Sequence, residues 1–246
     1  MPVEPRPMGI LRRSSDLVQL LAERGPLSTA DAAEQVGMPR PSAYRLSDAL
    51  SQARLVEPTA DGRLRVGLRW LRLADAARAG MTEWSGARLV LDDLASSTGQ
   101  TVYLTVPRAD RAVCIDWSRG RGVSVLALRP GRTLPLHAGA AGRVTLAFRP
   151  EPLDEYLKGA PFPPFTEHTL TRASELRDDV AATRSRGYSV SDEDVTPGIG
   201  ALGVPLIKDG TFRGALSLGG LADAMRAERD AFTVALAAAA ARLSAD

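Results

Sequence analysis

Two short helical patterns near the amino terminus, joined by a Gly-Met-Pro turn at residues 37–39, restrict the possible folds of this chain more than any other feature. Ser28 or Thr29 suits the N-cap of the first helix, and the glycine of the turn ends it. The second helix is expected to begin near Arg40, because Pro41 fits the first turn of a helix, where its missing N–H has no intrahelical role. Two short helices joined in this way predict a helix-turn-helix.

The flanking segments extend this motif. A helical pattern capped by Ser14 or Ser15 precedes it and ends at Gly25. After it, LVEPTADGRLRVG predicts two short strands around an Asp-Gly turn at residues 61–62. A hairpin in this position is typical of the wing of a winged helix-turn-helix, which binds DNA. The alternative is a small helical subdomain used for protein contacts.

The charge distribution supports DNA binding. Residues 1–80 contain 12 arginines and 9 acidic residues, a net charge of +3, whereas the remaining residues carry 19 basic and 20 acidic side chains, a net −1. A basic segment favours contact with a polyanion. In a helix-turn-helix the start of the second helix enters the major groove, where Arg bonds guanine edges or phosphates and hydroxyls bond phosphate oxygens. The predicted DNA-contacting residues are Ser28, Thr29, Arg40, Ser42, Tyr44, Arg45 and Arg63.

A helix is expected to link this module to the rest of the chain, because LRWLRLADAARAG has helical spacing and no breaker before Gly80. Its apolar stripe, Leu68, Leu71 and Ala74 or Asp75, suits packing against a second copy of the chain or against the chain itself. The expected domains are a winged helix-turn-helix over residues 1–67, the linker helix over 68–81 and a larger domain over 82–246.

The larger domain is expected to combine a sheet with helices. A helix capped by Thr82 comes first, and its expected buried residues are Leu89, Leu91 and Leu94. QTVYLTVPR, RAVCIDWSRG and VSVLALRPG then predict consecutive antiparallel strands. Further helices are expected from about Ala140, within EPLDEYLKG and SELRDDVAATRSRG, and over residues 225–243, after two strands in LGVPLIK and GALSLGG. Helices on one side of a mixed or antiparallel sheet predict an α+β fold.

Composition excludes several classes of protein. No apolar run approaches the ~18 residues that span a bilayer, and the start shows no signal-peptide core, so a cytoplasmic protein without membrane contact is expected. Cys114 is the only cysteine, which rules out an intrachain disulfide. With His137 and His168 as the only histidines, a zinc site made of Cys and His lacks ligands. No metal and no cofactor are expected.

Four patterns that suggest other chemistry have simpler interpretations. The glycines of residues 198–203 spell G-x-G-x-x-G, but the strand before and helix after them that a dinucleotide site requires are not predicted. The acidic residues 192–194 are interpreted as a solvated loop rather than a metal site. His137 and Ser217 lack a nucleophile elbow, so the histidine is interpreted as structural. Cys114, between apolar neighbours, is interpreted as a core thiol rather than a redox group.

Three segments resemble one known family: GMPRPSAYRLSDAL, LPLHAGAAGRVTLA, and RGYSVSDEDVTPGIGALGVPL leading to GALSLGG. They are similar to the isocitrate lyase regulator (IclR) family of bacterial transcription factors, and the resemblance covers essentially the whole chain. It implies a winged helix-turn-helix, a linker helix and a GAF-like α+β effector-binding domain. It also implies homodimers or homotetramers, a palindromic double-stranded DNA operator and a small organic effector bound by the carboxy-terminal domain.

The resemblance also implies where the effector binds, since in that family it lies in a cleft of the sheet near the loop after the LPLHA-like motif. Glycine and alanine let backbone N–H groups approach a ligand there, and a helix amino terminus favours an anion. Members that bind small keto acids tend to have an acidic residue at the position of Ser191, a cysteine at that of Ala201 and a serine at that of Gly219. The effector here is therefore expected to be bulkier and more apolar, such as an aromatic acid, or the pocket to be degenerate. The implied effector contacts are Leu126, Leu136, Gly139, Ala140, Ala141, Ser191, Ala201, Ser217 and Gly219.

Three functions are compatible with these expectations. The first is a sequence-specific DNA-binding regulator, repressor or activator, controlled by a small organic carboxylate or aromatic acid. The second is a ligand-independent DNA-binding regulator whose carboxy-terminal domain only oligomerises. The third is an enzyme, for which the sequence offers no convincing nucleophile with its base, metal set or cofactor motif. We therefore predict a regulator rather than an enzyme, with no catalytic residues.

Overall fold

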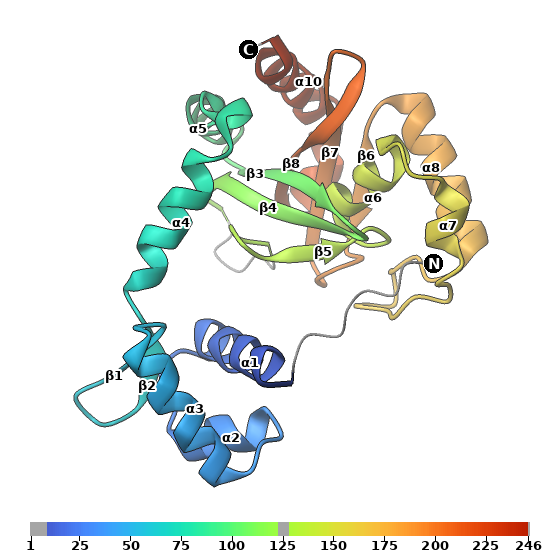
Figure 1. The fold of residues 1–246 in the computed structure, drawn as a ribbon. Coiled ribbons are helices and arrows are strands. Elements are labelled where there is room, and N and C mark those ends of the chain that lie inside the picture. The colour runs from blue at the N-terminus through green and yellow to red at the C-terminus, as the bar shows by residue number, and fades with distance from the viewer. Residues whose placement is uncertain (1–8, 123–127, 246) are drawn as a thin grey trace. The chain divides into compact units, whose positions relative to one another are not determined.

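The structure is a computed structural model that describes residues 9–122 and 128–245 (Figure 1). It divides into two compact units, one that ends at Thr82 and one that begins at Glu83. Most of the strand predicted in VSVLALRPG falls on residues 123–127, outside the described residues. Within the described ranges, no helix is long and apolar enough to cross a membrane.

The amino-terminal unit is a winged helix-turn-helix, as predicted. Its helices are α1 (Gly9–Arg24), α2 (Thr29–Gln35) and α3 (Arg40–Gln52), followed by the antiparallel hairpin of β1 (Val56–Pro58) and β2 (Leu64–Val66) and by α4 (Arg69–Ala79). One apolar cluster holds the helices and the hairpin together. Its buried members are Leu17, Leu21, Ala32, Ala33, Met38, Ala43, Leu46, Leu50, Val56 and Leu64.

The first helix begins earlier than predicted. Ser14 does not cap α1, because its hydroxyl lies within the helix and donates to the carbonyl of Ile10 at 2.8 Å. No residue from Ile10 to Arg13 breaks a helix, so α1 extends back to Gly9. A single Ser is therefore a weak marker of a helix start when good helix formers precede it.

Among the described residues of the carboxy-terminal unit, six strands form one sheet in which every neighbouring pair is antiparallel. The strand order is β5-β4-β3-β8-β7-β6. The strands are β3 (Thr101–Arg108), β4 (Arg111–Ser118), β5 (Thr133–Pro135), β6 (Ser189–Asp192), β7 (Ile199–Lys208) and β8 (Thr211–Leu221). The pairing of β3 with β8 joins residues 101–105 to residues 215–219 and places the first and last long strands at the centre.

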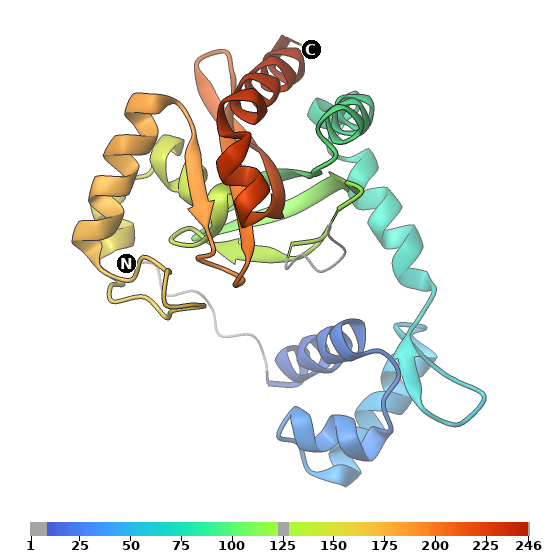
Figure 2. The same ribbon diagram turned by 180° about the vertical axis from the view of Figure 1, so that it is seen from behind.

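Helices cover both faces of this sheet, so the prediction of helices on one side was wrong (Figures 1 and 2). On β3, Val102 and Leu104 point into one apolar cluster and Tyr103 into the other. Because neighbouring side chains of a strand alternate between its faces, a strand that is apolar on both needs cover on both. The helical elements are η1 (Thr82–Trp84), α5 (Ala87–Thr98), α6 (Gly139–Phe148), α7 (Leu153–Leu157), α8 (Ala173–Arg186), α9 (Ala222–Ala227) and α10 (Arg229–Ala245).

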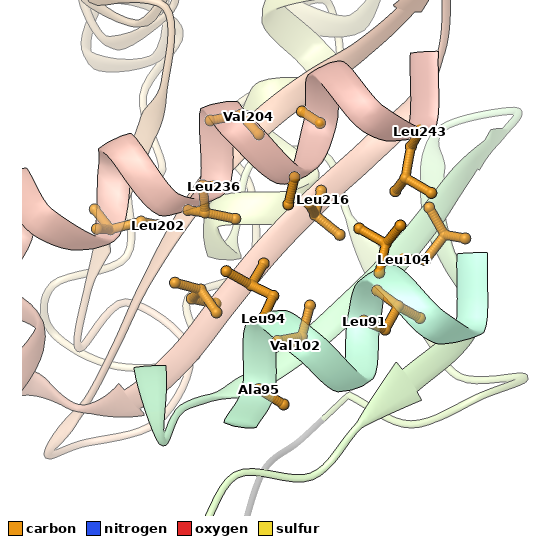
Figure 3. Packing of buried hydrophobic residues seen from close by; sticks show 14 of the residues in the cluster. Leu91, Leu94, Ala95, Val102, Leu104, Leu202, Val204, Leu216, Leu236 and Leu243 are labelled. Carbon is orange, nitrogen blue, oxygen red and sulfur yellow. The ribbon is translucent and has the colours of Figure 1, made fainter. Parts of the chain in front are cut away.

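The larger cluster lies between the sheet and the helices α5 and α10 (Figure 3). Leu91 and Leu94 of α5 and Leu236 of α10 are buried in it, as predicted for the first two. The prediction that Leu89 is buried was wrong, since this side chain is 72% exposed. Residues two apart on a helix point in nearly opposite directions, so Leu89 and Leu91 do not share a face.

Candidate functional site

The start of α3 presents polar side chains away from the core of the amino-terminal unit. Ala43, Leu46, Ser47 and Leu50 are buried and fix one face of α3 against the other helices. Arg40, Tyr44 and Arg45 are exposed on its other sides, whereas Ser42 is half-buried. Of the predicted DNA contacts, these residues therefore lie together at the amino-terminal end of α3, with the side chains of Arg40, Tyr44 and Arg45 exposed.

Two of the other predicted DNA contacts, Ser28 and Arg63, already have local partners. Ser28 caps α2, since its Oγ accepts the Asp31 N–H at 3.1 Å and donates to the Asp31 carboxylate at 2.7 Å. Thr29 is the first residue of α2 and is half-buried. Arg63 lies in the wing, where its Nε donates to Asp61 at 2.6 Å. An exposed ion pair of this kind is weak, so a phosphate can replace the aspartate as the partner of Arg63.

A cavity lies in the carboxy-terminal unit above the sheet. Its floor comes from β3, β8, β7 and β6, and its walls from the amino terminus of α6 and the segment before β7. The cavity volume is about 60 Å³. Its described lining residues are Tyr103, Leu128, Leu134, Gly139, Ala140, Ala141, Ser191, Val195, Thr196, Ile199, Ala201, Ser217 and Gly219.

Seven of the nine positions implied for an effector line this cavity: Gly139, Ala140, Ala141, Ser191, Ala201, Ser217 and Gly219. Leu136 does not, because its side chain is fully buried in the cluster under α6. Leu126 lies outside the described residues. The lining residues that sequence reasoning missed include Tyr103, although its place between two core residues of β3 already puts it on the opposite face of the strand.

Close packing explains two glycines, Gly142 of α6 and Gly203 of β7. A Cβ on Gly142 would lie 2.5 Å from the carbonyl oxygen of Pro135, and one on Gly203 would lie 3.0 Å from that of Ala140. Gly203 therefore lets β7 lie directly against α6, and Gly142 lets α6 lie against the end of β5. The G-x-G-x-x-G segment of residues 198–203 runs into a strand instead of a helix, so it lacks the strand–turn–helix arrangement of a dinucleotide site.

A buried ionic network supports one wall of the cavity. The Asp194 carboxylate accepts the N–H of Gly139 at 3.1 Å and the hydroxyl of Ser191. Arg143 of α6 lies 3.7 Å from Asp194 and 3.4 Å from Asp179 of α8. Asp194 is only 1% exposed, so the interpretation of residues 192–194 as a solvated loop was wrong for this residue. Its charge is balanced internally because its neighbours carry the matching donors.

The neighbouring acidic residues pair with an arginine. Arg226 of α9 pairs with Asp192 at 2.5 Å and with Glu193 at 3.4 Å. In the part of the chain that the structure describes, no three His, Cys, Asp or Glu side chains gather to hold a metal ion. Cys114 is buried, and burial raises the pKa of its thiol to about 12, which suppresses thiolate chemistry.

The described lining of the cavity carries no charged side chain. Its polar groups are the hydroxyls of Tyr103, Ser191, Thr196 and Ser217, and the rest of the surface is apolar. At the amino terminus of α6 the Gly139 N–H is bonded to Asp194, and the N–H groups of Ala140 and Ala141 follow in the same first turn, where backbone N–H groups lack a partner within the helix. An apolar cavity with a few placed polar groups is typical of a site for a small organic molecule.

Two family models match the chain. Residues 84–245 match the model for the carboxy-terminal domain of the bacterial transcriptional regulator IclR, and residues 11–60 match the model for the IclR helix-turn-helix domain. The glycerol operon regulatory protein of Streptomyces coelicolor is 30% identical over 205 residues, which cover 80% of this chain and 78% of that protein.

Solved structures show the same fold. An IclR from Thermotoga maritima is 26% identical and superposes with a TM-score of 0.73, covering 95% of this chain and 98% of the other. An IclR homologue from Microbacterium hydrocarbonoxydans, complexed with 4-hydroxybenzoate, is 20% identical with a TM-score of 0.82 and covers 96% and 98%.

Proposed function

This chain belongs to the IclR family of bacterial transcriptional regulators, and from that premise we propose that a small organic carboxylate or aromatic acid binds the cavity beside α6 and controls DNA binding. The family assignment makes the chain a DNA-binding regulator with a carboxy-terminal ligand-binding domain, not an enzyme. The observation that carries the proposal is the cavity itself, which is apolar apart from four hydroxyls and the helix N–H groups.

The size of the cavity limits the effector. A volume of about 60 Å³ holds roughly four to six water molecules, so a small carboxylate fits without rearrangement. An aromatic acid requires lining side chains such as Leu128 and Leu134 to move aside. The relative bound to 4-hydroxybenzoate makes that compound a suitable first probe, together with pyruvate and benzoate.

On the DNA side, we propose that a homodimer, or a tetramer built from dimers, places two α3 helices in successive major grooves about 34 Å apart. Arg40, Ser42, Tyr44 and Arg45 then contact bases and phosphates. The flanking contacts come from Ser28, Thr29 and Arg63. The exposure of Arg40, Tyr44 and Arg45 on α3 supports this assignment, and the operator is expected to be palindromic because the two half-sites meet identical helices.

The test is DNA binding by the purified full chain, measured by fluorescence anisotropy with the DNA upstream of its own gene and with a scrambled duplex. We expect tighter binding to the upstream DNA, and a five- to 150-fold change in its Kd with at least one probe, which corresponds to a coupling of about 1–3 kcal/mol. Specific binding that no probe changes would favour a ligand-independent regulator. Equal binding to both duplexes would contradict recognition of this upstream DNA as the operator.

A further inference from the structure

Tyr103 brings a buried and unused hydrogen-bonding group to the cavity. Its side chain lines the cavity from β3 and is only 5% exposed. No hydrogen-bond partner for its hydroxyl is found among the residues that the structure describes. Because leaving a buried hydroxyl unpaired is costly, nearly all such groups in proteins have a partner. The partner of this hydroxyl is therefore expected to come from outside the described residues, and a molecule bound in the cavity is in the right place to supply it.

The ring of Tyr103 is held in place by its neighbours. Tyr103 lies opposite Trp117 on β4 and opposite Ser217 on β8, and it stacks on Trp117 with the ring centroids 6.3 Å apart. On the third side, a Cβ at Gly219 would lie 3.4 Å from the ring. Burial raises the pKa of Tyr103, so the group stays a neutral phenol that both donates and accepts.

The opposite side of the cavity differs in this respect. Tyr103 lies on β3 and Ser191 on β6, which β8 and β7 separate, so their backbones are roughly 14 Å apart at about 4.8 Å per strand. The Ser191 hydroxyl and the Gly139 N–H are both bonded to Asp194. These two groups therefore have a partner within the chain, whereas the Tyr103 hydroxyl has none among the described residues.

We propose that Tyr103 contacts the effector and selects acids that carry a second oxygen function, a hydroxyl or a carbonyl, over acids that carry only the carboxylate. The inference rests on the proposed function of the cavity. The carboxylate lies toward the amino terminus of α6, and the second oxygen exchanges a hydrogen bond with the Tyr103 hydroxyl. No charge on the protein is needed for this discrimination, because a site with an unpaired polar group disfavours a ligand that leaves it unpaired.

The test compares benzoate with 4-hydroxybenzoate, which differ by one hydroxyl, on the full chain and on Tyr103→Phe by calorimetric titration. The full chain is expected to bind 4-hydroxybenzoate about three- to tenfold more tightly, which is the net worth of one hydrogen bond. Tyr103→Phe is expected to bind both alike. Tyr156→Phe serves as the control, because its hydroxyl bonds His137 and does not line the cavity; it should keep the preference.

Two results would overturn the proposal. The first is the same preference in the full chain and in Tyr103→Phe. The second is a lower melting temperature of ligand-free Tyr103→Phe, which would show that the hydroxyl has a partner within the chain; we expect an equal or higher one. If neither acid binds the full chain, the aromatic-acid part of the proposed function fails, and the melting temperature alone then decides the role of Tyr103.

Discussion

His137 is packed against the ring of Phe162, with centroids 4.7 Å apart, and both its ring nitrogens have partners. These are the Tyr156 hydroxyl and the Pro163 carbonyl oxygen, each at 3.1 Å. The structural interpretation of this histidine agrees with that geometry, since its ring nitrogens contact a phenol hydroxyl and a backbone carbonyl instead of Ser217. A neutral imidazole satisfies both contacts by donating to the carbonyl oxygen and accepting from the hydroxyl.

This arrangement predicts a pH dependence of stability. Burial lowers the pKa of His137 below its ordinary value, whereas the unfolded chain keeps a pKa of about 6.5. As the pH falls below about 6.5, the unfolded chain binds a proton that the folded chain does not, so the free energy of unfolding decreases until the folded pKa is reached. Urea unfolding between about pH 5 and 8 measures this.

The variant His137→Gln isolates the contribution of His137, because its free energy of unfolding should no longer decrease as the pH falls on account of this residue. Asp179 acts in the opposite direction, since burial raises the pKa of its carboxyl and the folded chain then holds a proton more strongly than the unfolded one. Subtracting the pH dependence of the free energy of unfolding of His137→Gln from that of the full chain removes the contribution of Asp179, which both proteins share. An equal slope in both proteins would show that His137 does not titrate differently on folding.

At the same scale, Arg45 should matter for DNA and not for folding. Its side chain is exposed on α3, so Arg45→Ala is expected to change the free energy of unfolding by less than about 0.5 kcal/mol. A lost base contact should weaken operator binding by about 1–3 kcal/mol. Anisotropy titrations check this, with Arg24→Ala, an exposed arginine of α1, as the matched control. Similar losses for both variants would mean a general charge effect and no specific contact.

Among the elements, α6 has three roles. Its backbone lies close to β7, its first residues line the cavity, and its Arg143 belongs to the buried ionic network. Arg143 is buried with a side-chain exposure of 7% and connects α6 to α8 and to the segment after β6. The pair formed by Arg177 and Asp154 is exposed and links α8 to α7 at 2.7 Å. An arginine–aspartate pair thus occurs both buried, at Arg143, and exposed to solvent, at Arg177.

Replacing the buried arginine is therefore expected to lower the free energy of unfolding more than replacing the exposed one. Arg143→Met leaves Asp179 and Asp194 without their cation in the interior, and we expect a loss of about 3–5 kcal/mol in the free energy of unfolding. Arg177→Met should cost about 1 kcal/mol or less. Chemical denaturation of the two variants provides the comparison, and equal losses would contradict the view that the network stabilises the position of α6.

At the scale of the whole molecule, the two units have separate apolar cores, the amino-terminal cluster and the clusters on either face of the sheet. In the amino-terminal unit, α4 has no buried residue; Leu68, which precedes it, is 63% exposed and its Leu71 is 65% exposed. These side chains remain available for the expected contact with a second copy of the chain. Separate cores also mean that a change in the cavity need not unfold the DNA-binding unit.

This separation leads to a prediction for Ala201→Trp. The larger side chain should fill the cavity and abolish the response of DNA binding to any effector, while the Kd for the operator without effector stays within about twofold, because α3 belongs to another core. Ile207→Trp, on the exposed part of the same strand, is the matched control and should keep the response. A retained response in Ala201→Trp would place the effector site elsewhere.

The sequence by itself determined the features that depend on neighbouring residues. The Ser28 cap, the Gly-Met-Pro turn and the Asp-Gly turn of the wing each act within a few positions, so the winged helix-turn-helix was predictable, as was the antiparallel run of β7 and β8. Most cavity positions were available only through the resemblance to a family, because their small side chains carry no chemical signal of their own.

Only the tertiary structure decided what depends on pairing between distant segments. The hydrophobic pattern of β3 does not reveal that it pairs with β8, more than 100 residues later, and so Tyr103 was missed. The burial of Asp194 was equally hidden, since its partners Gly139 and Arg143 come from α6. Local propensities act over a few residues, whereas burial and pairing are set by which surfaces meet once the whole sheet has formed.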